Sequence, residues 1–239
     1  MAEQQQSYKK ARFFKCALQV NPAGYLQYRG QEQTLSESAY NQQLLSAALE
    51  ANIEVIGLAD HGSVNDLNAF RDLFNQHKIV VFPGFEIASS EKIHFVCLFD
   101  ENETSQELER ILGSLELLNP EERVRPSKLS AEQLIDKVND LDGFIFAAHC
   151  TNENGVLKRR MNHVWQHKGL LAAQIPGSIE GLHGDENDFY RKVFLNKDPN
   201  YHRQREMVAI NASDVAKPED IKTQSASCLI KMTQPCFAS

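Results

Sequence analysis

Side chains that can bind metals or carry protons stand at the ends of four predicted strands in this 239-residue chain. In chain order they are Asp60 with His61, Glu86, His149 and Asp214. The strands that precede them are the apolar runs at residues 53–59, 79–82, 144–148 and 207–211. In α/β barrels and open parallel sheets, side chains at the carboxyl ends of separate strands converge. Such a mixed set of imidazoles and carboxylates suits divalent zinc, manganese or iron.

His94 lies inside a further predicted strand, residues 93–99, and is either a ligand that points into the same centre or a buried core histidine. Single strand-end residues also have structural explanations, since Asp60 can cap the next helix and Asp214 can anchor a turn. Because four predicted strands each end in a metal-binding or proton-transferring side chain, a functional site is favoured over four separate structural roles. A carboxylate such as Glu86 can bridge two ions, and clustered metals activate water and offset the charge of phosphoryl oxygens.

Three other groups are better explained as structure. His163 and His167 are spaced for one helix face, but no Glu lies between them and no third ligand accompanies them. The basic run at 158–160 is either a solvated surface or a phosphate-contacting patch beside His149. Cys150 is either a soft ligand or a small buried thiol.

Helical and strand periodicities alternate along the chain and define the elements that must position these residues. Apolar residues recur at helical spacing in residues 38–51, 65–76, 106–118 and 130–141, where Ser130 can cap the last helix. The Pro83-Gly84 pair is expected to end the strand at 79–82. Repeated alternation predicts a parallel sheet, either doubly wound or closed into a barrel. The chain contains no G-x-G-x-x-G sequence and no P-loop.

Composition narrows the function classes. The chain has 25 Lys and Arg against 32 Asp and Glu, a formal charge of −7, which argues against a broad surface that coats nucleic acid. Its five scattered cysteines indicate a reducing, cytoplasmic compartment. No apolar run reaches the roughly 20 residues needed to span a bilayer, so no membrane association is expected. One domain covering residues 1–239 is expected, and the ending LIKMTQPCFAS suggests that it continues into a longer protein.

Five segments together resemble motifs of the PHP (polymerase and histidinol phosphatase) superfamily. They are GLADHGSVND, FPGFEI, KIHFVCLF, AAHC and NASDVAKPEDI, and their order and spacing cover nearly the whole chain. The resemblance implies a distorted (β/α)7 barrel that holds up to three divalent ions for phosphoester hydrolysis. It nominates as metal ligands His61, Glu86, His94, His149 and Asp214. It also implies that Asp60 is a supporting carboxylate and that Asp60, His61 and His149 carry the catalytic steps.

The chain departs from the family pattern at three positions. Gln19 and Asn21 replace both histidines of the family's first motif, and Ala216 replaces the histidine of its last motif. Amide oxygens bind zinc poorly and harder ions better, so Gln19 and Asn21 are weak candidate ligands. The group of Glu86, His94 and His149 is complete and can hold one ion. Fewer than three ions of zinc, manganese or magnesium are therefore expected.

The amino-acid sequences of these motifs are most similar to those in the N-terminal PHP-like domain of bacterial SMC- or ABC-type ATPases that defend against phage. This resemblance implies a metal-dependent phosphoesterase or nuclease domain, with nucleic acid as substrate and an ATPase domain or subunit as partner. A catalytically degenerate docking or regulatory module is the alternative, because three family histidines are missing. The substrate, the oligomeric state, including self-association, and the activity of the isolated domain stay open.

Overall fold

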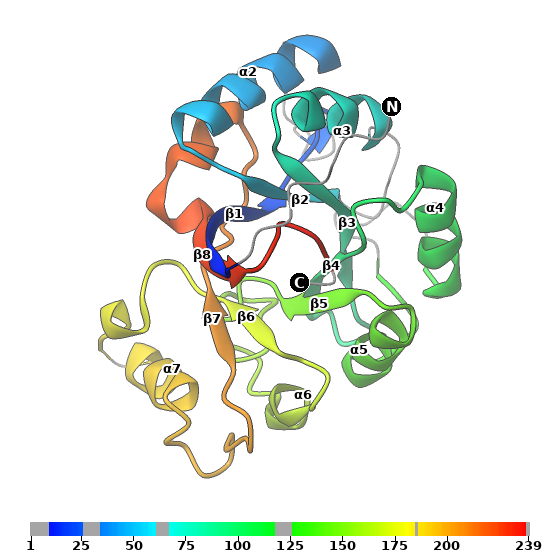
Figure 1. Cartoon of the computed structure of the whole chain (residues 1–239). Helices are drawn as coiled ribbons and strands as arrows, with labels where there is room; N and C mark the ends of the chain where they lie inside the picture. The colour runs from blue at the N-terminus through cyan, green and yellow to red at the C-terminus, as the bar shows by residue number, and fades with distance from the viewer. Residues whose placement is uncertain (1–9, 26–33, 61–66, 118–125, 185, 238–239) are drawn as a thin grey trace.

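Eight strands form one sheet that curls into a nearly closed ring (Figure 1). The computed structural model describes residues 10–25, 34–60, 67–117, 126–184 and 186–237. The strands within these residues are β1 (Arg12–Val20), β2 (Val55–Asp60), β3 (Val80–Ala88), β4 (His94–Leu98), β5 (Phe144–Ala147), β6 (Ala172–Gln174), β7 (Val208–Ile210) and β8 (Cys228–Met232). Their order across the sheet is β7-β6-β5-β4-β3-β2-β1-β8. The strands predicted from periodicity are therefore present.

The sheet is mixed, so the expectation of a wholly parallel sheet is wrong. β4 runs antiparallel to both β3 and β5, and β8 runs antiparallel to β1. A tight turn joins β3 to β4, in which Ser89 N donates to Ile93 O at 2.8 Å. Such a short connection cannot hold the crossover that two parallel neighbours need. The reversal places the beginning of β4 beside the ends of β3 and β5.

The ring closes where the chain after β7 returns to β1. Val215 forms a parallel bridge with Val20. Asn21 N donates to Val215 O at 3.1 Å, and Val215 N donates to Gln19 O at 3.0 Å. The expected distorted barrel is confirmed, and its closure brings the end of β1 beside residues 214–216.

Helices cover the outside of the ring in Figure 1. They are α2 (Glu37–Glu50), α3 (Leu67–Gln76), α4 (Ser105–Ser114), α5 (Ala131–Asp140), α6 (Asn162–Gln166) and α7 (Glu186–Phe194), with short 3-10 turns η1 (Ile179–Gly181), η2 (Pro218–Lys222) and η3 (Gln224–Ala226). Ser130 caps α5 as predicted, because its hydroxyl accepts from Gln133 N at 3.2 Å. None of the helices in the described ranges is long and apolar enough to cross a bilayer.

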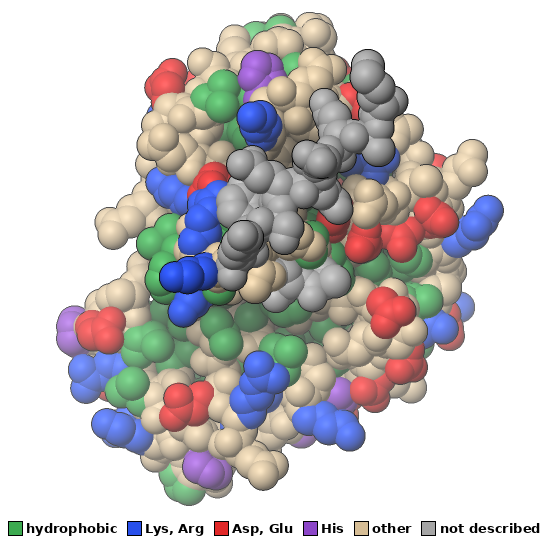
Figure 2. Space-filling view, in the orientation of Figure 1, with side chains coloured by type: hydrophobic (Ala, Val, Ile, Leu, Met, Phe, Trp, Pro, Cys, Tyr) green, Lys and Arg blue, Asp and Glu red, His purple; other side chains and the backbone are tan. Residues whose placement is uncertain are grey.

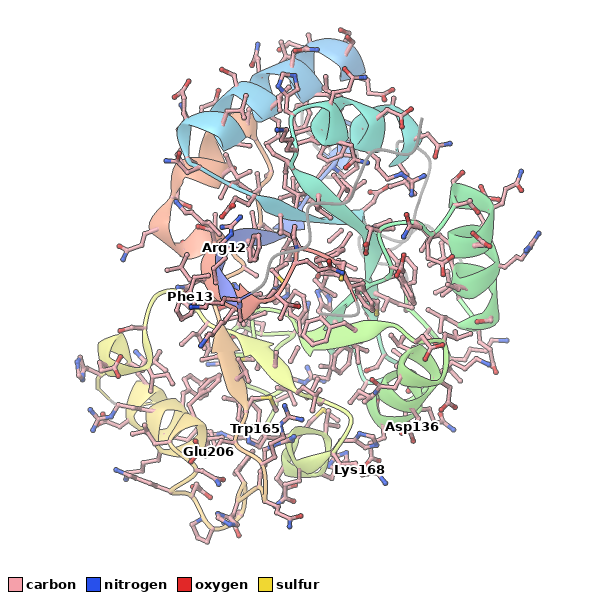
Figure 3. The ribbon with its side chains drawn as sticks, in the orientation of Figure 1. Arg12, Phe13, Asp136, Trp165, Lys168 and Glu206 are labelled. Carbon is pink, nitrogen blue, oxygen red and sulfur yellow. The ribbon has the colours of Figure 1, made fainter. Side chains whose placement is uncertain are left out.

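Strand alternation divides the buried residues into two layers. Phe82, Val96 and Phe146 fill the interior of the ring. Side chains of the opposite parity face the helices, where the labelled Trp165 of Figure 3 packs edge-on against Phe194 of α7 at 5.0 Å between ring centroids. Because side chains two apart share a face, Glu86 lies on the face of Phe82, and His94 on that of Val96.

The predicted break at Pro83-Gly84 is wrong, because β3 continues through both residues to Ala88. Pro83 still accepts a hydrogen bond from Phe99 N at 2.8 Å through its carbonyl oxygen. A Cβ atom on Gly84 would overlap the carbonyl oxygen of Cys97 on β4. Gly84 is therefore needed for the close approach of β4, and Glu86 belongs to the strand itself.

The surface in the orientation of Figure 2 carries Lys and Arg side chains together with Asp and Glu side chains. The charge of this face is therefore mixed in sign.

Among the exposed large apolar residues that the structure describes, Phe13 on β1 and Leu229 on the neighbouring β8 are the most accessible, at 59% and 65%.

Substitution Gly84→Ala should destabilise the protein by about 2–4 kcal/mol, because the added methyl group must push the β4 backbone away from β3. Gly113→Ala is the matched control: Gly113 lies in α4, where a Cβ would meet no atom within 4 Å. That change should stabilise the fold by about 0.5–1 kcal/mol. Urea unfolding of the three proteins measures both effects. Equal stability of Gly84→Ala and the parent protein would contradict the close approach.

Candidate metal centre

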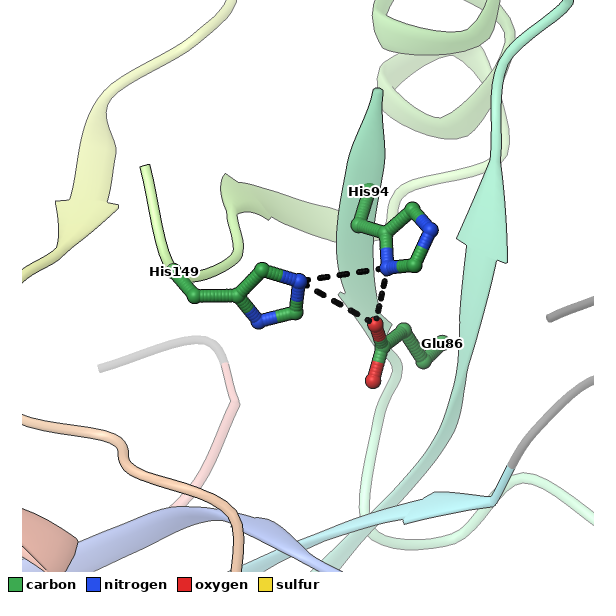
Figure 4. Close-up of side chains that lie close together, drawn as sticks. All are labelled: Glu86, His94 and His149. Atoms are coloured by element: carbon green, nitrogen blue, oxygen red, sulfur yellow. Dashed lines mark hydrogen bonds and ion pairs between the residues drawn. The ribbon is translucent and has the colours of Figure 1, made fainter. Parts of the chain in front are cut away.

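Three potential ligands come together from three neighbouring strands (Figure 4). Glu86 lies near the end of β3, His94 begins β4, and His149 follows β5. The antiparallel direction of β4 brings its first residue to the rim where β3 and β5 end. In the described part of the chain, this is the one group of at least three His, Cys, Asp or Glu side chains with the spacing of a metal site.

The distances within this group fit one divalent ion. Glu86 Oε1 lies 2.9 Å from His94 Nδ1. His149 Nε2 lies 3.1 Å from His94 Nδ1 and 3.8 Å from Glu86 Oε1. A circle through these three atoms has a radius of about 1.9 Å, close to the roughly 2.0–2.2 Å of zinc bonds to imidazole nitrogen and carboxylate oxygen. Glu86, His94 and His149 would together hold such an ion.

The accessibility of the ligands differs from one side of the group to the other. The side chain of Glu86 is 1% exposed, whereas those of His94 and His149 are 13% and 21% exposed. A buried carboxylate requires compensating partners, which the two imidazoles provide. The histidine side of the group is therefore more accessible to solvent than the Glu86 side.

An unusual backbone conformation directs His149 into the site. His149 has φ of 27°, a positive value that is uncommon for residues other than glycine. Its N–H donates to the side-chain Oε1 of Gln174, and the next N–H, of Cys150, donates to Gln174 O at 3.2 Å. Gln174 at the end of β6 is itself buried. The turn after β5 is therefore held by a neighbouring strand, and such local strain is common at functional sites.

Asn154 holds His94 from the loop that follows His149. His94 N donates to Asn154 O at 3.1 Å, and the Asn154 side-chain nitrogen lies 3.1 Å from His94 Nε2. With the amide in this orientation, Asn154 Nδ2 donates to Nε2, so Nδ1 carries the imidazole proton and donates to Glu86 Oε1. Binding of an ion through Nδ1 requires the Asn154 amide to turn its oxygen toward an Nε2–H. Sequence reasoning missed both Gln174 and Asn154. A polar residue in the apolar run at 170–175 was the available signal for Gln174, while nothing in the sequence distinguishes Asn154.

Burial lowers the pKa of His149, His94 lowers it further, and the nearby Glu86 carboxylate opposes the shift. The imidazole is therefore neutral near pH 7. A neutral imidazole is the form that binds a metal ion.

The two amides at the end of β1 face carboxylates of the rim. Gln19 Nε2 donates to Glu86 Oε2 at 2.9 Å. Asn21 Nδ2 donates to Val215 O at 3.3 Å and lies 3.5 Å from Asp214 Oδ1. Asp214 therefore lies beside Asn21 and outside the group of Glu86, His94 and His149. Its predicted role as a ligand stays a prediction, as do those of Gln19 and Asn21.

Of Asp60 and His61, only Asp60 lies in the part of the chain that the structure describes. Asp60 ends β2 opposite Phe85 and shares its strand face with Leu58, whose side chain packs toward the helices. Asp60 is half-buried and does not belong to the group of three. His61 lies outside the described residues. The catalytic roles predicted for Asp60 and His61 therefore stay predictions.

His163, His167 and Cys150 lie outside the group of three. His163 is exposed, and His167 Nε2 lies 3.4 Å from Asp136, which Figure 3 labels on α5. Cys150 is fully buried, burial raises the pKa of its thiol, and its Sγ donates to Gln174 O at 3.0 Å. A protonated, buried thiol is a poor nucleophile.

Comparisons with known proteins identify the architecture. No family model matches the chain, and no curated protein is similar to it at the sequence level. Among solved structures, the lesion-specific endonuclease PfuEndoQ of Pyrococcus furiosus superposes with a TM-score of 0.59 at 14% identity, covering 89% of this chain and 51% of that protein. The chain thus spans about half the length of that endonuclease.

Two further structures are similar. A two-domain protein of Bacteroides vulgatus, described as containing a predicted PHP-like metal-dependent phosphoesterase, has a TM-score of 0.55 at 10% identity over 98% of this chain and 64% of its own. PsfC of Pseudomonas syringae has a TM-score of 0.51 at 12% identity over 87% of this chain and 78% of its own. The chain therefore has a PHP-type fold, a nearly closed mixed barrel with a His/Glu group at its rim.

Proposed function

We propose that this chain is a divalent-metal-dependent phosphoesterase that cleaves nucleic acid. The convergence of Glu86, His94 and His149 at the rim of a PHP-type barrel is the observation that carries the proposal. Three protein ligands of this kind leave a coordination position open, as catalytic zinc sites require. A bound divalent ion would supply Lewis acidity toward a phosphoryl oxygen and an attacking water.

Side chains of the protein are proposed to bind the ion, admit the substrate and transfer protons. Glu86, buried at the centre, brings the negative charge that a cation needs, and the imidazoles of His94 and His149 complete the set. The partly exposed histidine side admits the substrate. Asp60, the last residue of β2, and His61, the next residue in the sequence, are proposed to transfer protons to and from the reacting oxygens.

Nucleic acid is the proposed substrate for two reasons. The superposed PfuEndoQ is a lesion-specific endonuclease. The basic run at 158–160 also follows the turn that holds His149, where cationic side chains would meet phosphate groups. Lys158 Nζ lies 3.8 Å from the exposed carboxylate of Glu153, an exchangeable surface contact that a phosphate could replace.

The alternative function, a catalytically degenerate docking or regulatory module, is supported by Gln19, Asn21 and Ala216 in place of family histidines. Coupling to an SMC- or ABC-type ATPase, a role in defence against phage, a cytoplasmic location and self-association are likewise proposals that rest on the sequence. The complete Glu86, His94 and His149 group favours the enzyme, because a docking role alone would not require it.

His149→Ala and Glu86→Gln should each reduce Mn²⁺-dependent cleavage of DNA and of a phosphate-diester reporter by at least about 100-fold, because either change removes a ligand. His163→Ala, an exposed histidine on α6, is the control and should retain full activity. Cleavage rates are compared with and without a chelator. If the parent chain binds no divalent ion, or if both variants keep full metal-dependent activity, the phosphoesterase proposal is wrong. The docking or regulatory module would then be the better explanation.

The stability of metal-free protein should fall as the pH drops from about 7.5 to about 5.5. The folded state holds His149 neutral, whereas the unfolded chain takes up a proton near pH 6.5, so acid favours unfolding. Urea unfolding in chelator at the two pH values measures the loss. His149→Gln cannot take up this proton and should lose less stability over the same interval. An equal loss in both proteins would show that His149 does not contribute.

A further inference from the structure

The two oxygens of the Glu86 carboxylate have different partners. Oε1 faces the two histidines, at 2.9 Å from His94 Nδ1 and 3.8 Å from His149 Nε2. Oε2 instead accepts a hydrogen bond of 2.9 Å from Gln19 Nε2. Gln19 and Glu86 are each 1% exposed. The carboxylate therefore offers one oxygen to the ligand group, while the other is already engaged by a buried, neutral donor.

A neutral amide excludes a cation from the position that it occupies. An ion on Oε2 would have to approach within about 2.0–2.2 Å, into the space of the Gln19 N–H. The amide orientation follows from the chemistry, since an amide oxygen turned toward a carboxylate would be repelled. After this donation, Gln19 Oε1 is buried and has no hydrogen-bond partner among the described residues. An unpaired buried oxygen costs free energy, and the bond to Glu86 is the contact that Gln19 gains in return.

The same arrangement recurs two residues later. Asn21 is fully buried, and its Nδ2 donates to Val215 O and lies 3.5 Å from Asp214 Oδ1. Within the described ranges, its Oδ1 also has no hydrogen-bond partner. The end of β1 and the residue that follows it thus present two amide N–H groups toward carboxylates of the rim. Each amide supplies partial positive charge without an ion.

We infer that Gln19 restricts the centre to a single divalent ion and positions Glu86 as a ligand through Oε1 alone. The inference rests on the proposed metal-dependent function and specifies its stoichiometry. Gln19 is a positioning residue in this scheme. It makes no contact with the ion and acts through the carboxylate that it holds.

Metal content measures this role directly. Chelator-treated protein is dialysed against Mn²⁺, and the ions per chain are counted by elemental analysis, with affinity measured by calorimetry. The parent chain should bind one ion. Gln19→Leu removes the donor without adding charge, so it should still bind one ion, about 10–100-fold more weakly, because Glu86 is no longer oriented. Gln166→Leu, an exposed amide on α6 bonded to His202 O, is the matched control and should not differ from the parent.

A second variant tests the exclusion itself. Gln19→Glu keeps the shape of the side chain but sets a carboxylate against Glu86 Oε2, and the two negative groups should recruit a further cation. Two Mn²⁺ ions per chain are expected, and circular dichroism verifies that each variant is folded. Two or more ions in the parent chain, or unchanged affinity in Gln19→Leu, would overturn the inference and leave the phosphoesterase proposal standing. Absence of any ion from the parent chain would overturn both.

Discussion

A carboxylate buried at the rim of the barrel imposes the constraint on which the site depends. Glu86 is 1% exposed, and a charge that is removed from water is tolerated only when hydrogen bonds or opposite charges compensate it. Its neighbours come from three other parts of the sheet: Gln19 of β1, His94 of β4 and His149 after β5. The partners that compensate the buried Glu86 carboxylate are in place only when β1, β3, β4 and β5 are arranged as they are here. The geometry of the site therefore depends on the arrangement of these four strands.

The scaffold meets this constraint through local features that regular structure alone would not produce. The tight turn between β3 and β4 reverses the chain, so the start of one strand lies beside the end of another. Gly84 permits the close contact of these two strands. The positive φ of His149, held by Gln174, turns an imidazole inward where the strand ends. These features place three ligand atoms at distances that suit one ion.

The two amides at the end of β1 have a physical interpretation in this arrangement. An amide can donate a hydrogen bond to a carboxylate where an imidazole would share an ion with it. Gln19 satisfies Glu86 in this way, and Asn21 lies beside Asp214. The rim thus combines one candidate ligand group, Glu86, His94 and His149, with a second region in which neutral donors face acids.

The amino-acid sequence by itself determined most elements and their order, because helical and strand periodicities follow directly from the pattern of apolar residues. It also identified Glu86, His94 and His149 as candidates. Only the tertiary structure decided the direction of β4, the passage of β3 through Pro83 and Gly84, and the contacts of Gln174 and Asn154. Strand direction and contacts between distant residues depend on which segments pair in space. The periodicity of apolar residues indicates the type of each element but not which elements pair. Whether a strand-end residue joins the site therefore becomes visible only in the folded chain.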